Sequence, residues 1–100
     1  MKVGNIDIPA DAIADLCRRY QVRELALFGS VLRPDFRPDS DIDILVDFEP
    51  DAVIGLMKFA RLQRELSVLL RRTVDLVPKD GLKRLIRDEV LAHSEVVFAQ

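Results

Sequence analysis

Residues 41–48 alternate between polar and apolar side chains, and this pattern constrains the fold more than any other stretch of the chain. Apolar side chains stand at Ile42, Ile44, Val46 and Phe48, and the positions between them are Asp41, Asp43, Leu45 and Asp47. Successive side chains of a strand point to opposite faces of a sheet, so the alternation predicts a strand with one buried face. An isolated Asp-x-Asp is more often a solvated polar face than a functional site. Aspartate is nevertheless a poor strand former, so the two carboxylates on one face need a reason.

A second strand is predicted at Val22–Phe28, and a Gly29-Ser30 turn follows it directly. The later half of this strand is apolar throughout, as expected where both faces are covered. Glycine lets the backbone approach a bulky anion, and the N–H groups of the turn with the Ser30 hydroxyl suit phosphate oxygens. A Gly-Ser dipeptide alone is usually an ordinary turn, since both residues are common turn formers.

Asp75 lies within a third predicted strand, Thr73–Val77. If this strand pairs beside residues 41–48, Asp75 joins Asp41 and Asp43 in one cluster. Three such charges would repel one another by several kcal/mol in a partly dry cleft, at an effective dielectric constant near ~20. Protonation or bound cations must relieve this repulsion. Carboxylates are ligands for hard divalent cations, so a metal site is the simpler hypothesis.

Three helices complete the predicted fold: one that Pro9-Ala10-Asp11 opens and that runs to about Tyr20, one from Val53 to Leu70 and one from Leu82 to Val90. Residues 31–40 are expected to form a short helical turn and a loop, and Glu95–Phe98 either another turn or a short edge strand. The order predicts an α/β or α+β fold, a small mixed sheet flanked by helices. The apolar stripe expected to face the core on the second helix comprises Leu56, Met57, Phe59, Ala60, Leu62, Leu66, Leu69 and Leu70. On the third helix the side chains expected inward are Leu82, Leu85, Ile86 and Val90.

Length and charge narrow the class of protein. One hundred residues suit a single domain, and the lone Cys17 cannot form an internal disulfide, which points to a reducing compartment. With no signal-peptide h-region and no long apolar run, we expect a cytoplasmic protein that does not enter a membrane. Seven acids against one base between Asp35 and Asp51 suit a divalent cation. No basic stripe interleaved with aromatics is present, so direct nucleic-acid binding is not expected.

The residues in their order resemble a known family. Leu27-Phe28-Gly29-Ser30, ten residues and then Asp41-Ile42-Asp43 resemble the Gly-Ser-x₁₀-Asp-x-Asp motif of the nucleotidyltransferase superfamily. Residues 27–48, with Val74-Asp75-Leu76-Val77 and residues 82–90, are similar to the small branch called minimal nucleotidyltransferases. The resemblance covers nearly the whole chain. Pro34 and Val31 depart from the commonest form of the loop, which leaves the loop geometry and the phosphate affinity open.

The resemblance implies a single minimal nucleotidyltransferase domain over residues 1–100 that transfers AMP from ATP to a hydroxyl, with Mg²⁺, two ions, as cofactor. It implies that Asp41, Asp43 and Asp75 are the catalytic, metal-binding acids. Asp75 is either a metal ligand or a base for the acceptor. The residues that the resemblance assigns to the nucleotide are Gly29, Ser30, Ser40 and Arg33.

The resemblance also implies a partner. Minimal nucleotidyltransferases are typically encoded beside a HEPN protein as a toxin–antitoxin pair, so the expected acceptor is a tyrosine of a HEPN toxin in a hetero-oligomer. Two alternatives stay open: an antitoxin that only masks its toxin, and an adenylyltransferase for a small molecule such as an aminoglycoside. The three acids favour the enzyme over the mask, and the lack of a second, helical substrate domain speaks against the small-molecule substrate.

Overall fold

A mixed four-stranded sheet, in the order β5-β4-β3-β6, forms the centre of the computed structural model. The structure describes residues 1–37 and 39–100, with the side chains of residues 84 and 85 left aside. β3 (Val22–Phe28) pairs antiparallel with both β4 (Ile42–Phe48) and β6 (Glu95–Ala99), and β4 pairs parallel with β5 (Val74–Pro78). The expected small mixed sheet flanked by helices is confirmed, and the C-terminal segment is the edge strand of the two possibilities.

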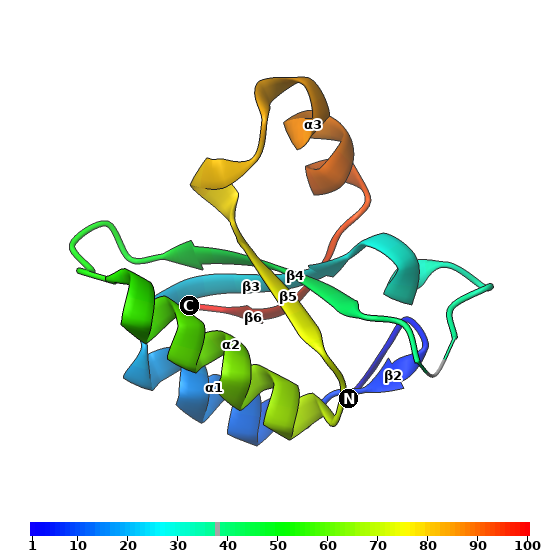
Figure 1. Cartoon of the computed structure of the whole chain (residues 1–100), viewed down its shortest axis with the longest axis horizontal. Helices are drawn as coiled ribbons and strands as arrows, with labels where there is room; N and C mark the ends of the chain where they lie inside the picture. Colours follow the sequence, from blue (N-terminus) through cyan, green and yellow to red (C-terminus); the bar gives the residue numbers. More distant parts are fainter. Residues whose placement is uncertain (38) are drawn as a thin grey trace.

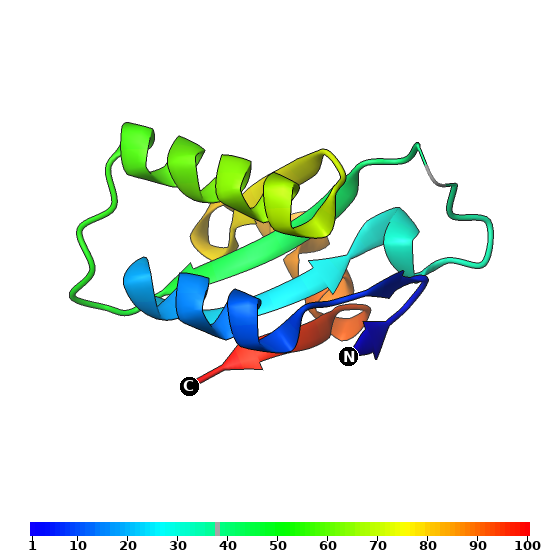
Figure 2. The ribbon, with the colours of Figure 1, turned by 90° about the horizontal axis from the view of Figure 1, so that it is seen from below.

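Two helices cover one face of the sheet and a third lies on the other side (Figures 1 and 2). The pair is α1 (Ala10–Arg19) and α2 (Leu56–Leu70), and the third is α3 (Arg84–Ala92). Two short 3₁₀ helices, η1 (Gly29–Leu32) and η2 (Lys79–Gly81), follow β3 and β5 directly. No helix in the described part of the chain is long and apolar enough to cross a membrane.

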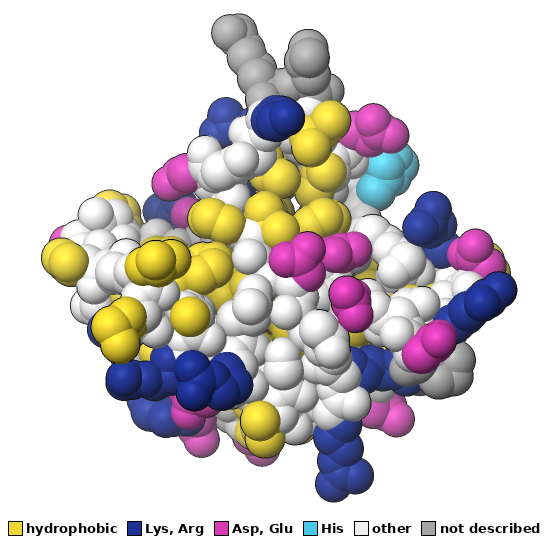
Figure 3. Space-filling view, in the orientation of Figure 1, with side chains coloured by type: hydrophobic (Ala, Val, Ile, Leu, Met, Phe, Trp, Pro, Cys, Tyr) yellow, Lys and Arg dark blue, Asp and Glu magenta, His cyan; other side chains and the backbone are white. Residues whose placement is uncertain are grey.

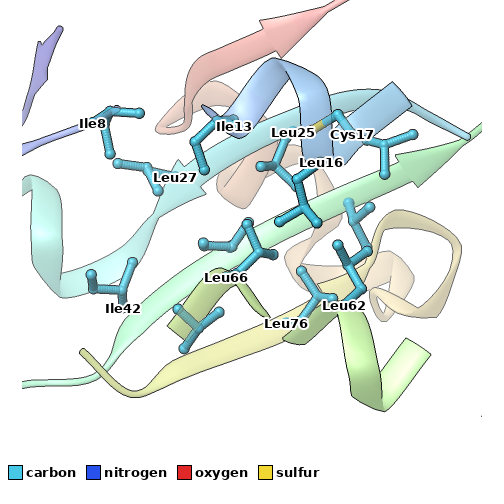
Figure 4. Packing of buried hydrophobic residues seen from close by; sticks show 14 of the residues in the cluster. Ile8, Ile13, Leu16, Cys17, Leu25, Leu27, Ile42, Leu62, Leu66 and Leu76 are labelled. Carbon is cyan, nitrogen blue, oxygen red and sulfur yellow. The ribbon is translucent and has the colours of Figure 1, made fainter. Parts of the chain in front are cut away.

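The hydrophobic core lies between the sheet and the α1–α2 pair (Figure 4). Ile42, Ile44 and Val46 of β4 are buried in it, as the alternating pattern predicts. From the other elements the core takes Ile13, Leu16, Leu25, Leu27, Leu62, Leu66, Val74 and Leu76. The intervening positions of β4 consequently face the side of the sheet away from α1 and α2.

A hairpin of two short strands near the N-terminus was not predicted from the sequence. β1 (Lys2–Val3) pairs antiparallel with β2 (Ile6–Asp7). At its turn, the Asn5 side-chain amide donates to the carbonyl oxygens of Val31 and Arg33, both at 2.8 Å. The hairpin thereby anchors the segment that follows Gly29-Ser30.

The start of α2 differs from the sequence-based expectation. The helix begins at Leu56 rather than Val53, because Gly55 before it has extended backbone, with φ −78° and ψ 172°. The side chains of Leu56 and Met57 do not face the core: they are 85% and 81% exposed. Packing against the core starts at Phe59, and Leu62 and Leu66 are the fully buried residues of the stripe. The predicted stripe is therefore wrong for the first turn of the helix.

The last predicted helix is shifted by two residues, to Arg84–Ala92. Leu82 and Val90 are half-buried, as expected of inward positions, but Ile86 is exposed, which corrects the expectation for that residue. α3 presents this side chain to solvent because, of the described α-helices, it alone lies on its side of the sheet (Figure 2), whereas α2 packs against the core beside α1. The side chain of Leu85 lies outside the described residues.

Candidate functional site

Asp43 and Asp75 are directly opposite each other on neighbouring strands, because β4 and β5 pair in parallel with these two residues in register. Adjacent strands lie about 4.8 Å apart. The residues that flank each aspartate, Ile42 and Ile44 on β4 and the core residues of β5, are buried under α1 and α2. Both carboxylates therefore lie on the opposite face. Figure 3 shows acidic side chains close together near the middle of the surface in view.

Asp41 stands one residue before β4 and is exposed. The backbone N–H of Ile42 donates to the carbonyl of Thr73 at 2.9 Å, which fixes the entry to β4 beside the start of β5. Asp41 is thus held at the same end of this strand pair as Asp43 and Asp75.

Negative charge from two neighbours acts on Asp43. Burial raises the pKa of Asp43 first, and the carboxylates of Asp75 and Asp41 raise it further, while the Arg33 guanidinium offsets part of the increase. The charged form of Asp43 is therefore disfavoured by its surroundings, and a cation placed among the three acids would favour it.

Gly29 lies against the carboxylate of Asp43. Phe28, the last residue of β3, is the register partner of Asp43, and the chain turns at Gly29 with φ +77°. A Cβ built on Gly29 would lie 2.3 Å from Asp43 Oδ2, so a side chain there would have to displace this carboxylate. Both the backbone angle and the contact require glycine at this position.

Ser30 and Arg33 follow Gly29 on η1 and at its end. Ser30 is half-buried, and the backbone N–H of Arg33 donates to its carbonyl at 3.0 Å. The influence of Arg33 on the pKa of Asp43 places its charge near the acids. The structure thus brings the Gly-Ser turn, Arg33 and the aspartates to one region of the surface.

Ser40 is in a different position from the other proposed nucleotide ligands. It lies in the loop before Asp41, where its Oγ accepts a hydrogen bond from the backbone N–H of Arg37 at 3.4 Å. This contact serves the loop, and a role of Ser40 in phosphate binding stays a prediction.

A pocket beside Gly29 was not foreseen from the sequence. It has a volume of about 610 Å³ and is lined by Gly29, Leu32, Arg33 and residues 92–95. His93, at the end of α3, and Glu95, at the start of β6, bring polar groups into it. These residues are about sixty positions from Gly29, and only the pairing of β6 with β3 brings them near. The sequence carried no motif that would have signalled this proximity.

Two polar side chains of α2 hold β5 in place. The backbone N–H of Leu76 donates to Gln63 Oε1 at 2.9 Å, and that of Val74 donates to Ser67 Oγ at 3.0 Å. β5 is an edge strand, and these N–H groups flank Asp75 on the side away from β4. α2 therefore replaces a missing neighbouring strand and fixes the backbone on both sides of Asp75.

The donor set fits a hard divalent cation. Three carboxylates of one strand pair supply oxygen ligands, and Gly29 leaves free the space over Asp43 Oδ2 that a Cβ would fill. In the described part of the chain, no three His, Cys, Asp or Glu side chains are already arranged around a common point as a metal centre. Metal binding by Asp41, Asp43 and Asp75 is accordingly a proposal.

The sheet order, the Gly-Ser turn and the paired aspartates define a nucleotidyltransferase. The family model described as "Nucleotidyltransferase domain" matches residues 11–97, and the chain belongs to this family. It is 46% identical over 84 residues to the protein adenylyltransferase MntA of Thermococcus cleftensis, covering 84% of this chain and 81% of that protein.

Solved structures share the fold. One that carries the name minimal nucleotidyltransferase is 39% identical, with a TM-score of 0.71 over 85% of both chains. A toxin–antitoxin structure with AMP-PNP has a TM-score of 0.73 at 22% identity, covering 93% of this chain and 75% of that one. A tri-AMPylated HEPN toxin of Shewanella oneidensis in complex with its MNT antitoxin has a TM-score of 0.65 at 22% identity, covering 91% and 70%. At this identity, the last two show likeness of fold alone.

Proposed function

We propose that this nucleotidyltransferase is a Mg²⁺-dependent protein adenylyltransferase that transfers AMP from ATP to a tyrosine hydroxyl of a HEPN toxin, and so acts as its antitoxin. The observation that carries the proposal is the register of Asp43 opposite Asp75, with Gly29 against the Asp43 carboxylate. Two acids and the Gly-Ser turn thus lie close together, which supports a site for a cation and a triphosphate. The MntA relative at 46% identity supports protein as the class of acceptor.

The proposed reaction is a substitution at the α-phosphorus of ATP. The acceptor oxygen forms a bond to this phosphorus, the bond to the bridging oxygen of the β-phosphate breaks, and pyrophosphate leaves with that electron pair. The hydroxyl proton passes to a carboxylate or to water. Asp75 is exposed, and we propose that it either takes that proton or completes the cation site.

The remaining residues position the nucleotide. The backbone N–H groups at Gly29 and the Ser30 hydroxyl would hold the terminal phosphates, since a backbone without a side chain allows close approach. The Arg33 guanidinium would pair with the same phosphates. Bound Mg²⁺, held by the carboxylates of Asp41, Asp43 and Asp75, would supply charge neutralisation for the triphosphate.

The partner is proposed from the relatives. The AMPylated HEPN toxin in complex with an MNT antitoxin, and the toxin–antitoxin structure with AMP-PNP, share this fold. We propose a cognate HEPN toxin as both acceptor and partner in a hetero-oligomer, with ATP as the AMP donor. Because these solved structures are complexes of toxin and antitoxin, neutralisation by binding alone, without AMP transfer, is the competing function.

The test mixes the purified chain with labelled ATP, Mg²⁺ and the product of the adjacent reading frame, and measures mass added to that product. We expect added AMP with wild type, and none with Asp43→Ala or in EDTA. Circular dichroism checks that Asp43→Ala stays folded. Tight binding without added mass would establish masking instead, and undiminished transfer by Asp43→Ala would refute the assigned site.

A further inference from the structure

We infer that the first turn of α2 and the groove beside it form the docking surface for the acceptor protein, which inserts an apolar segment there. The inference rests on the proposed function and names where the protein substrate is held. We define the α2 patch as Leu56 and Met57 of this first turn together with Val53 of the loop before the helix.

The α2 patch is unusually exposed. Its three side chains are 86%, 85% and 81% exposed, although large apolar side chains close together are normally buried. Together they present roughly 400 Å² of apolar surface, a patch size that on a monomer is often functional. Figure 3 shows hydrophobic side chains gathered on the same side as the loop before α2, apart from the acidic side chains in the middle of the face.

A groove of about 610 Å³ adjoins the patch. Leu56 belongs to both, and the other apolar walls come from Phe48, Pro50, Ile54, Phe59 and Pro78. Four charged side chains also line the groove: Asp47, Glu49, Lys79 and Asp80. Asp47 is paired with Arg23 at 2.5 Å and with Lys79 at 4.0 Å, and Glu49 accepts a hydrogen bond from the Gln100 side chain. Because most of these charged groups have partners within the chain and the other walls are apolar, the groove favours an apolar occupant.

The groove lies on the same pair of strands as the candidate active site. Its floor is formed by the later parts of β4 and β5, the same two strands that carry Asp43 and Asp75. Asp47 lies on the same face as Asp43, and four residues of strand span about 13 Å. A segment seated in the groove would therefore hold a hydroxyl on the same protein within reach of the acids.

The area favours an acceptor protein over a second copy of this chain. The patch supplies about half of the ~800 Å² that each partner buries in a standard interface. A second copy of the chain that bound only to this patch would bury too little area for a stable dimer. An acceptor protein contacts the acid site as well as the groove, because its hydroxyl must reach the acids for the reaction, and this second contact supplies the remaining area.

The test compares acidic substitutions at the two ends of α2, one in the patch and one away from it. Leu56→Asp combined with Met57→Asp places charge on the patch, and an acid in the first turn of a helix is favourable, so folding should be retained. The matched control is Val68→Asp, because Val68 is 72% exposed on the same helix but lies beside α1. The measurements are KM for the acceptor protein, kcat, the affinity for ATP, and oligomeric state by light scattering.

For the patch variant we expect the acceptor KM to rise at least about tenfold with unchanged kcat and ATP affinity, as for the loss of interface anchors. Val68→Asp should behave as wild type. An unchanged acceptor KM, an equal rise in Val68→Asp, or a wild-type dimer that the patch variant dissociates would each overturn the inference. If AMP transfer is absent altogether but the complex still depends on the patch, the docking surface stands and the proposed reaction fails.

Discussion

Gly29 and the carboxylate of Asp43 are in contact across the β3–β4 pair, with space between them too small for any side chain. A Cβ on residue 29 would lie 2.3 Å from Asp43 Oδ2. The glycine allows the turn to close directly against the carboxylate that the reaction is proposed to use.

Gly29→Ala should impair both folding and transfer. The left-handed backbone at φ +77° costs an L-residue about 1–2 kcal/mol. Displacement of Asp43 by about 1 Å would lower AMP transfer by roughly a hundredfold. Gly55→Ala is the matched control for stability alone, since a Cβ there meets nothing within 4 Å but the residue lines the proposed docking groove. Urea unfolding and transfer rates measure both effects, and wild-type activity in Gly29→Ala would contradict the proposed geometry.

Gln63→Ala should loosen β5 and with it Asp75. The substitution leaves the N–H of Leu76 without its acceptor, a loss of about 1–3 kcal/mol of unfolding free energy. Gln63→Glu retains an acceptor oxygen and should recover most of the stability. Hydrogen exchange at Leu76 and the apparent Mg²⁺ affinity are the readouts. If exchange at Leu76 is equally slow in Gln63→Ala, α2 does not hold this strand.

The site was the most predictable part of the molecule. The alternation around Asp43 predicted which face of β4 is buried. The spacing between Gly29-Ser30 and Asp41-Ile42-Asp43 predicted that the turn lies near the two acids. Placing Asp75 required one further condition, that its strand pair with β4, and the register meets that condition. Short-range patterns were sufficient for the face that each aspartate takes, because strand periodicity alone determines it, whereas the position of Asp75 opposite Asp43 depends on the pairing of the two strands.

Features that depend on distant contacts were not predictable. Nothing near His93 signals that it lines a pocket with Gly29, since the pairing of β6 with β3 creates the proximity. The two-residue strands of the N-terminal hairpin are too short to show a period. The exposure of Leu56 and Met57 was misjudged because periodicity shows which residues share an apolar stripe but not whether the chain itself covers it.

Cys17 should be inert in the folded protein. Its side chain is fully buried, and burial raises the pKa of its thiol to about 12. The thiolate is the reactive form, so iodoacetamide should alkylate Cys17 at about pH 8 only when the chain unfolds. The labelling rate should rise with urea in parallel with loss of circular dichroism. Rapid labelling of the native protein would contradict the packing of α1 on the sheet.

Asp43→Asn should stabilise the fold while abolishing transfer. Burial and the neighbouring acids raise the pKa of Asp43, so the folded state holds this proton more tightly than the unfolded chain does. The stability that this proton confers on the wild type is full below the unfolded pKa and is lost as pH rises through the folded pKa. The stability advantage of Asp43→Asn should therefore grow with pH over that interval and then level off. Urea unfolding of both proteins from about pH 3 upward measures it, without and with Mg²⁺. Mg²⁺ should stabilise the wild type more than the variant, and a variant that Mg²⁺ stabilises equally would remove Asp43 from the proposed cation site.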